Sequence, residues 1–259
     1  MTKIIGIISG KGGVGKTTSA INLGSALNFF GKDVTVVDAN LTTPNIGVYL
    51  GVPVAPVTIH HVLQGKNHIS DSIYLHPSGT KIVPGSIALK DLSNIDPGKL
   101  KNKMLDLVGL TDICLIDGAA GLGKEAISAI EASDELLIVT NPELPAITDA
   151  LKAVKLAEKV GIPIIGAILT RVKLDGLDMT ITNVEEMLEV PVLGVIPEDT
   201  AVRKAMVSKN TIIDSYPKSS SSIAYKKLAA KLIGEDYQED INQKKTKTII
   251  DAILSIFRK

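Results

Sequence analysis

The glycine-rich stretch at residues 10–18 constrains this chain more than any other feature of its sequence. It reads Gly10-Lys11-Gly12-Gly13-Val14-Gly15-Lys16-Thr17-Thr18 and matches the phosphate-binding pattern G-x-x-x-x-G-K-[ST]. It follows the β-branched run Lys3–Ser9 and opens the helical pattern Lys16–Phe30, which is the setting a P-loop requires. We therefore expect the loop amides to cradle phosphates, Lys16 to reach the β- and γ-phosphates, and the Thr17 hydroxyl to ligate Mg²⁺.

Short β-branched runs alternate with helical patterns along most of the chain. The expected strands are Lys3–Ser9, Val34–Val37, Ile113–Ile116, Glu135–Thr140, Pro163–Leu169 and Val192–Ile196. The expected helices are Lys16–Phe30, Pro97–Val108, Lys124–Ala132, Pro145–Val160, Thr182–Glu189 and Ala201–Lys209. This alternation predicts an α/β fold with a doubly wound, mostly parallel sheet flanked by helices and ligands at the carboxyl ends of the strands. Residues 72–82 break the rhythm and are expected to add an irregular hairpin.

A change of composition near residue 234 predicts how the chain is divided. Residues 1–234 are expected to form one P-loop domain, closed by a helix at Ser221–Ile233 with Gly234 as its stop signal. Residues 235–245 are polar and charged, which is typical of a flexible linker. Residues 246–259 are expected to form an amphipathic helix. Its apolar stripe consists of Ile249, Ile250, Ile253, Leu254 and Phe257, widened by Ile256.

Composition excludes several classes of protein. The 28 basic and 28 acidic residues cancel, so no overall field draws the protein to nucleic acid. Cys114 is the single cysteine and is expected to be buried, which excludes disulfides and cysteine-ligated clusters within one chain and indicates a reducing compartment. The apolar N-terminal stretch is too short for a signal sequence or a membrane span, so we expect a cytoplasmic protein.

The second lysine of the glycine-rich loop makes the pattern more specific. The run K-G-G-V-G-K-T-T resembles the deviant Walker A signature of the MinD/ParA family of P-loop ATPases, and the resemblance covers about residues 1–234. It implies that Lys11 crosses a dimer interface to the partner's nucleotide, so that a homodimer forms only with ATP. It also implies ATP or ADP and Mg²⁺ as the ligands.

Two strand ends resemble the switch segments of this family. The first is the end of the expected strand Val34–Val37, and its resemblance implies that Asp38 acts near Mg²⁺ and the attacking water. Bacterial MinD-like sequences commonly carry a second aspartate where this chain has Asn40, and an amide orients water without accepting its proton, so we expect slow hydrolysis. The second implies that Asp117 holds Mg²⁺ through water, as Asp38 does, and that Gly121 lets a backbone amide approach the γ-phosphate. Ala119 replaces the usual proline and leaves this loop less preorganised.

Three later segments resemble the base-binding segments of the family. Asn141 and Arg171 follow expected strands, and Pro197, Glu198 and Asp199 belong to a stretch similar to the I-P-E-D sequence that lies over the adenine in MinD proteins. Each segment alone is an ordinary transition from strand to loop. Their order along the chain favours ATP over GTP.

The C-terminal segment predicts association with a membrane. Its apolar stripe is surrounded by the basic residues Lys244, Lys245, Lys247, Arg258 and Lys259. Two such segments in an ATP-bound homodimer would bind an anionic membrane jointly. The expected location is therefore the inner face of the cell membrane, reached peripherally from the cytoplasm, where a regulator or cargo protein is positioned. The alternative is that this helix packs on its own domain or on a partner protein.

The sequence is compatible with other functions. A ParA-type ATPase would bind DNA through a basic face such as Lys152, Lys155 and Lys159, although nucleic acid is not expected. The single cysteine argues strongly against a carrier of metal clusters. A nucleotide-sensitive scaffold with little hydrolysis is compatible with Asn40 and Ala119. The process that is positioned, whether cell division, motility or chemosensing, is not specified by these residues. The histidines are expected to be structural: His60, His61, His68 and His76.

Overall fold

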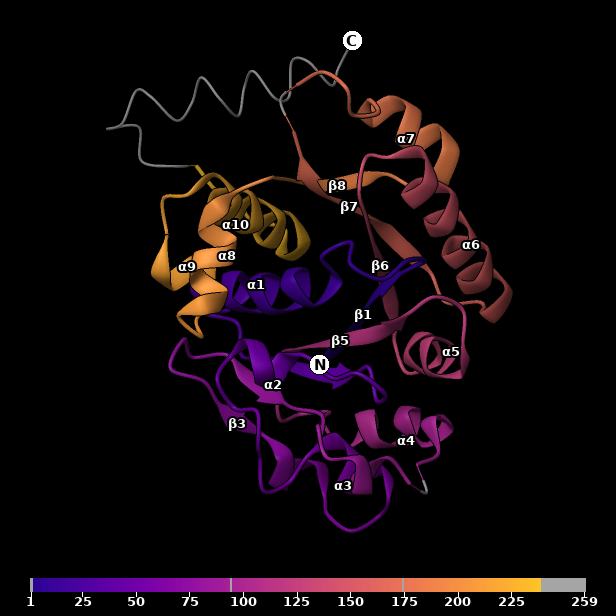
Figure 1. The fold of residues 1–259 in the computed structure, drawn as a ribbon, viewed down its shortest axis with the longest axis vertical. Coiled ribbons are helices and arrows are strands. Elements are labelled where there is room, and N and C mark those ends of the chain that lie inside the picture. Colours follow the sequence, from indigo (N-terminus) through magenta and orange to yellow (C-terminus); the bar gives the residue numbers. More distant parts are fainter. Residues whose placement is uncertain (1, 94, 174, 239–259) are drawn as a thin grey trace.

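The computed structural model describes residues 2–93, 95–173 and 175–238 (Figure 1). In this part of the chain, eight strands form one sheet in the order β3-β4-β2-β5-β1-β6-β7-β8. The strands are β1 (Lys3–Ser9), β2 (Val34–Ala39), β3 (Tyr74–Leu75), β4 (Lys81–Val83), β5 (Ile113–Ala120), β6 (Glu135–Thr140), β7 (Ile164–Val172) and β8 (Val192–Pro197). Neighbouring strands are parallel except β3 and β4. The doubly wound, mostly parallel sheet is confirmed.

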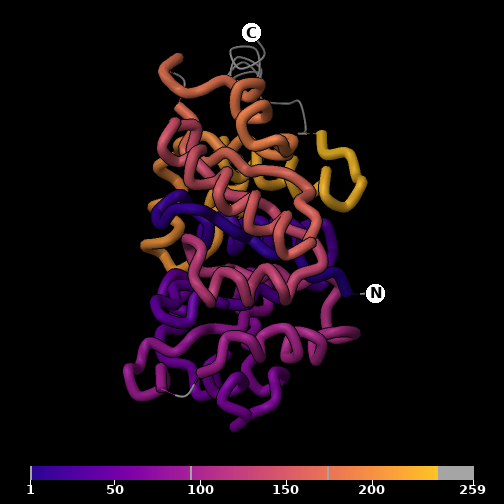
Figure 2. The backbone as a smooth tube through the Cα atoms, turned by 90° about the vertical axis from the view of Figure 1, so that its right-hand side faces the viewer, coloured from indigo at the N-terminus to yellow at the C-terminus, as the bar shows by residue number. Residues whose placement is uncertain are grey.

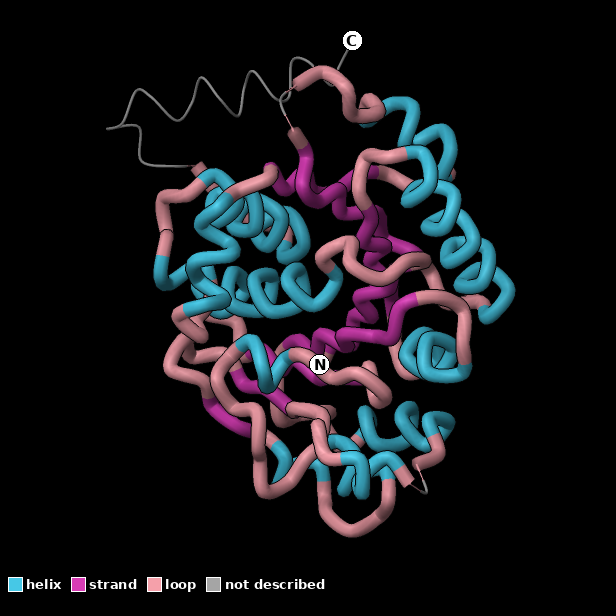
Figure 3. The backbone as a smooth tube through the Cα atoms, viewed as in Figure 1, coloured by secondary structure: helices cyan, strands magenta, loops and turns pink. Residues whose placement is uncertain are grey.

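Helices cover both faces of the sheet (Figures 1 and 3). One layer contains α1 (Lys16–Phe29), α8 (Thr200–Val207), α9 (Ile212–Ser215) and α10 (Ser220–Ile233). The other contains α3 (Ile59–Leu63), α4 (Leu100–Leu105), α5 (Lys124–Glu131), α6 (Leu144–Val160) and α7 (Ile181–Leu188), and it faces the viewer in Figure 2. Short pieces complete the set: α2 (Ile46–Tyr49) and the 3₁₀ turns η1 (Ile69–Ser72), η2 (Leu89–Leu92) and η3 (Pro97–Lys99).

The central strand β1 shows why the chain forms three layers. Ile5 and Ile7 pack into the core under α1 and α10, whereas Ile4 and Ile8 pack into the core under α5 and α6. A strand whose successive side chains are all buried has no solvent face, so helices must cover both sides. Because β1 lies between β5 and β6 in the sheet, the P-loop that follows it directly is near the middle of the sheet's carboxyl edge.

Several elements differ from the expected ones, and two of the differences concern the expected helix Pro97–Val108 and the expected hairpin at residues 72–82. The expected helix Pro97–Val108 is divided into the 3₁₀ turn η3 and the shorter helix α4, because Asp96 accepts a hydrogen bond from the Gly98 amide and sets up a tight first turn. The irregular hairpin is present as β3 and β4, but β4 also pairs with β2 and extends the main sheet. Its parallel pairing depends on a contact that is distant in sequence, so no local pattern indicates it.

The C-terminal region is described only up to residue 238. Helix α10 ends at Ile233, and Gly234 adopts a left-handed conformation with φ of 72°, as expected of a helix stop signal. The boundaries of the domain, the linker and the amphipathic segment stay predictions, because residues 239–259 lie outside the described residues. Within the described ranges, no helix has the length and apolar character needed to cross a bilayer.

Candidate functional site

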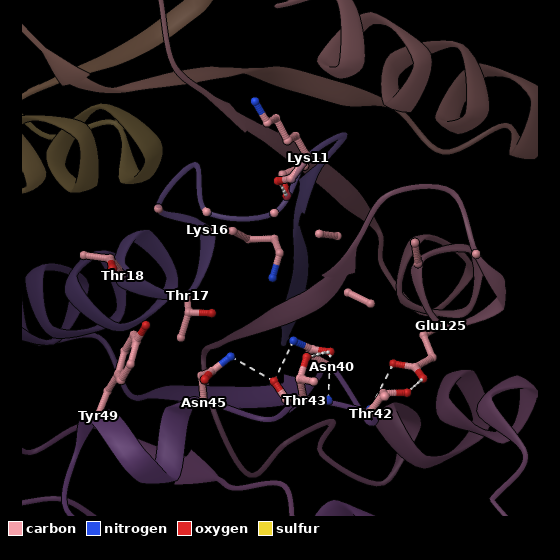
Figure 4. A pocket seen from close by; sticks show the side chains of 18 of the residues that line it. Lys11, Lys16, Thr17, Thr18, Asn40, Thr42, Thr43, Asn45, Tyr49 and Glu125 are labelled. Carbon is pink, nitrogen blue, oxygen red and sulfur yellow. Dashed lines mark hydrogen bonds between the residues drawn. The ribbon is translucent and has the colours of Figure 1, made fainter. Parts of the chain in front are cut away.

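A pocket of about 700 Å³ opens at the carboxyl edge of the sheet, where the loops after β1, β2 and β5 meet. Its walls come from the P-loop and the first turn of α1, the loop 40–45, the end of β5 and the start of α5. Figure 4 shows the labelled side chains around this space. Topology therefore brings the expected phosphate loop and both expected switch segments to one site.

The P-loop is held in place by its neighbours. Gly15 has φ of 91°, a left-handed conformation that a residue with a side chain rarely adopts, and it lets the chain turn into α1. The Thr170 hydroxyl on β7 donates a 2.5 Å hydrogen bond to the Val14 carbonyl. Because the first turn of α1 lines the pocket, its N-terminal amides are available to an anion.

Lys16, Thr17 and Asp117 form a compact cluster below the loop. The Lys16 Nζ lies 2.7 Å from Asp117 Oδ1, and the Thr17 hydroxyl donates to Asp117 Oδ2 at 2.6 Å. Asp38 is the register partner of Asp117 on the neighbouring strand β2, and both carboxylates are fully buried. The hydroxyl and carboxylate oxygens of this cluster fit Mg²⁺, since protein-bound Mg²⁺ takes one or two carboxylates together with phosphate oxygens. The Lys16 ammonium beside them fits phosphate.

Asp38 has a raised pKa in this cluster. Burial, together with the nearby charge of Asp117, raises its pKa from 3.8 to about 7. Its Oδ2 accepts the amides of Asn45 and Ile46 at 2.8 and 2.9 Å, which oppose the shift without cancelling it. Asp38 therefore both orders the loop after β2 and costs the nucleotide-free protein free energy whenever it is ionised.

Replacing Asp38 with asparagine should change how stability depends on pH. The folded protein holds the Asp38 proton more tightly than the unfolded chain, so this stabilisation is present at low pH and is lost as pH rises through about 7. From about pH 5.5 to about pH 8, the nucleotide-free wild type should lose about 2 kcal/mol of unfolding free energy relative to Asp38→Asn. Urea unfolding at both pH values measures this, and a pH-independent difference would contradict it.

The strand that carries Asp117 is longer than the sequence predicts. The expected strand ends at Ile116, but β5 continues to Ala120, which pairs with Ser9. The Gly121 amide then donates to the Ser9 carbonyl at 3.0 Å. Alanine at 119 explains the difference, because a proline there would restrict the backbone and disfavour a continuing strand. In this structure the Gly121 amide is therefore bound to the backbone of β1.

The loop after β2 is closed by Asn40. The Asn40 Nδ2 donates to the Thr43 carbonyl at 2.7 Å, and Asn40 Oδ1 accepts the Thr43 hydroxyl at 3.1 Å. Asn40 also lines the pocket, as does the exposed Lys11, whose ammonium points away from Lys16 (Figure 4). The structure thus brings Lys11, Lys16 and Asn40 to the same pocket with different orientations.

The expected base-binding residues are only partly at the pocket. Arg171 lines it, with a positive φ of 55°. Asn141 instead binds Thr170 through its Nδ2, at 2.9 Å from both the carbonyl and the hydroxyl oxygen. The Pro197 carbonyl accepts the Ser221 hydroxyl, and Asp199 caps α8 through the Ala201 amide. Pro197, Glu198 and Asp199 are not among the residues that line this pocket.

Sequence reasoning missed several side chains that line the pocket. Glu125 in the first turn of α5 binds the loop after β2, and Tyr49 and Lys124 also border the space. An acidic residue at the start of the helix after Asp117 was a visible signal, because a carboxylate is favoured at a helix N-terminus. Nothing in the sequence indicated what it would bind.

Comparison with known proteins agrees with this geometry. Residues 5–212 match the CobQ/CobB/MinD/ParA nucleotide binding domain family. An uncharacterized ATP-binding protein of Methanocaldococcus jannaschii is 40% identical over 257 residues, covering 99% of this chain and 97% of that protein.

Two solved structures are also similar. The septum site-determining protein MinD of Pyrococcus horikoshii, in complex with Mg-ADP, superposes with a TM-score of 0.85 at 37% identity, covering 90% of this chain and 96% of that one. MinD of Aquifex aeolicus in its MinC:MinD complex gives a TM-score of 0.78 at 27% identity, covering 92% and 98%. With the P-loop, its two lysines and the paired aspartates in one site, the chain belongs to the MinD/ParA family of P-loop ATPases.

Proposed function

We propose that the chain is a MinD-like ATPase that binds Mg·ATP, forms a homodimer with ATP between the protomers, and associates reversibly with a membrane through residues 246–259. Slow hydrolysis resets this cycle, during which the dimer positions a partner protein. The observation that carries the proposal is the cluster of the buried Lys16 and Asp117 with Thr17, beside the buried Asp38 and under a loop that also presents Lys11.

Each residue of the cluster has a proposed role. Lys16 and the start of α1 bind the β- and γ-phosphates, while Thr17 directly, and Asp38 and Asp117 through water, hold Mg²⁺. Bound Mg²⁺ neutralises charge on the phosphate oxygens. Lys11 reaches the nucleotide of the second protomer. The other proposed contacts to nucleotide come from the P-loop and the base-binding segments: Gly10, Gly12, Gly13, Val14, Gly15, Thr18, Gly121, Asn141, Arg171, Pro197, Glu198 and Asp199.

Hydrolysis is proposed to be slow because of Asn40. Its carboxamide is engaged with Thr43, and an amide in this position orients water without taking a proton. Positioning and charge stabilisation contribute most to phosphoryl transfer, so turnover is reduced rather than lost. A partner that rearranges the loop after β2 would raise the rate.

The proposed partners are a second copy of the chain, the inner face of the cell membrane and a regulator or cargo protein. The structure of MinD with MinC shows that a relative binds a protein partner. Cell division is one process that such a partner could serve, and other positioned assemblies fit the site equally. The scaffold alternative, with nucleotide binding but little turnover, differs from this proposal only in the rate of hydrolysis.

A DNA-binding role has less support. Lys152 pairs with Asp149 at 2.9 Å, and Lys155 pairs with Glu189 at 2.8 Å and with Glu158 at 3.2 Å. Acidic partners balance these lysines, so this face of α6 does not offer the net positive charge that phosphate backbones require. The ParA-type alternative would need another basic surface.

The dimer is tested by measuring mass in solution with light scattering. We expect the wild type to be monomeric with ADP and dimeric with Mg·ATP, and Lys11→Ala to stay monomeric in both while still binding ATP. The matched control is Lys159→Ala, a lysine in the last turn of α6, which should dimerise as the wild type does. If Lys11→Ala dimerises with ATP, the proposed role of Lys11 in the dimer interface is contradicted.

A further inference from the structure

A single carboxylate from α5 holds the loop that follows β2. Glu125 Oε2 accepts the Leu41 amide at 2.9 Å and the Thr42 amide at 3.3 Å, while Oε1 accepts the Thr42 hydroxyl at 2.5 Å (Figure 4). Hydrogen bonds to an ionised acceptor are stronger than those between neutral groups. Glu125 therefore binds two consecutive residues of the loop, although more than 80 positions separate them in sequence.

A second side chain, that of His60, binds the same loop through a backbone carbonyl instead of an amide. His60 Nδ1 accepts the Ser86 amide at 3.0 Å, which leaves Nε2 to carry the hydrogen and donate it to the Leu41 carbonyl at 2.8 Å. Burial lowers the pKa of His60 and favours this neutral form. Leu41 is itself buried, and its backbone N–H and C=O are both hydrogen-bonded, to Glu125 and His60 respectively.

The position of Glu125 connects the two loops that flank the phosphate site. Helix α5 begins at Lys124, four residues after Ala120, where β5 ends. Asn40 lies directly before Leu41, and both Asn40 and Glu125 line the pocket. The Glu125 carboxylate therefore joins the segment after β5 to the residues next to Asn40.

We propose that Glu125 is a positioning residue that couples the loop after β5 to the loop after β2, so that both respond together to the nucleotide and Asn40 is held in place for hydrolysis. This inference rests on the proposed ATPase function. Leu41 is buried and is hydrogen-bonded to both His60 and Glu125. The loop after β2 therefore has one well-defined position when the Glu125 carboxylate is present. Loss of the carboxylate frees the loop without removing any proposed phosphate or Mg²⁺ ligand.

Steady-state kinetics test the role in catalysis. Glu125→Ala should lower kcat by roughly 10-fold to 100-fold and change KM for ATP little, because misplaced reacting groups cost rate rather than binding. Glu125→Gln keeps an oxygen that accepts the backbone amides and should retain part of the rate. Thr42→Val removes only the hydroxyl, and its effect should not add to that of Glu125→Ala, since the two groups share one interaction. The control is Glu131→Ala, at the other end of α5, with unchanged kinetics.

Hydrogen exchange tests the coupling separately from turnover. In the wild type, Mg·ADP should change the protection of residues 40–43 and 121–124 together. In Glu125→Ala, residues 121–124 should still respond, whereas residues 40–43 should exchange fast in every nucleotide state. Unchanged protection of residues 40–43 in this variant, or unchanged kcat, would overturn the proposal. If the wild type itself fails to hydrolyse ATP, the proposed function fails, and the exchange experiment still decides whether Glu125 couples the loops.

Discussion

Replacing Lys16 with alanine is expected to lower ATP turnover by about a hundredfold or more, the usual cost of losing a group that stabilises charge in a transition state. The Lys16 ammonium is nearly buried and lies 2.7 Å from Asp117, close to Asp38. Its loss removes the cation that we propose binds the phosphates, and it leaves two buried carboxylates without their neighbouring positive charge. Nucleotide affinity should therefore fall together with turnover.

Titration with a fluorescent ATP analogue and a phosphate-release assay measure both effects of Lys16→Ala. Circular dichroism must show that the variant is folded, because an uncompensated buried charge also destabilises the protein. Lys159→Ala serves as the surface-lysine control. Wild-type affinity and turnover in Lys16→Ala would show that phosphate binds elsewhere.

Replacing Gly10 with alanine is expected to destabilise the protein by about 3 kcal/mol, or a melting temperature lower by about 6–12 °C for a domain of this size. A Cβ at residue 10 would lie 1.9 Å from the Asp149 carbonyl oxygen and 2.8 Å from the Ala150 nitrogen. Both are backbone atoms of α6, so no side chain can rotate away and the P-loop must move. The first glycine of the motif thus lets the loop pack against α6.

Gly12→Ala is the matched control for Gly10→Ala. A Cβ at residue 12 would meet nothing within 4 Å, so its melting temperature should stay close to that of the wild type. Differential scanning calorimetry without nucleotide separates this packing effect from any effect on phosphate binding. Equal melting temperatures for the two variants would contradict the close approach between the P-loop and α6.

Local patterns were sufficient to predict the scaffold of the site. Strand β1 has the predicted bounds Lys3–Ser9, and the P-loop leads into α1 at Lys16, as the motif requires. These elements are specified by neighbouring residues, through β-branched runs, glycines and helical periodicity. The meeting of Asp38 with Asp117 was expected from the resemblance of both strand ends to the family's switch segments, which implied that both aspartates lie near Mg²⁺.

Contacts between distant segments were not predictable in the same way. The extension of β5 to Ala120 depends on pairing with Ser9, and the hydrogen bond from the Leu41 amide to Glu125 depends on how α5 lies relative to the loop after β2. Such contacts leave no periodic signal, since any exposed glutamate would look the same in the sequence. The hydrogen bonds that Pro197 and Asp199 make with Ser221 of α10 are likewise contacts between distant segments.

Co-sedimentation with liposomes containing anionic lipid tests the central claim most directly. The full chain and a chain ending at Lys245 are compared with ATP, ADP and no nucleotide. We predict that only the full chain with Mg·ATP sediments, with an apparent affinity on the order of a hundredfold above that with ADP, because two C-terminal segments bind jointly in the dimer. A full chain that stays in the supernatant with ATP, or a truncated chain that sediments equally, would contradict nucleotide-controlled membrane association.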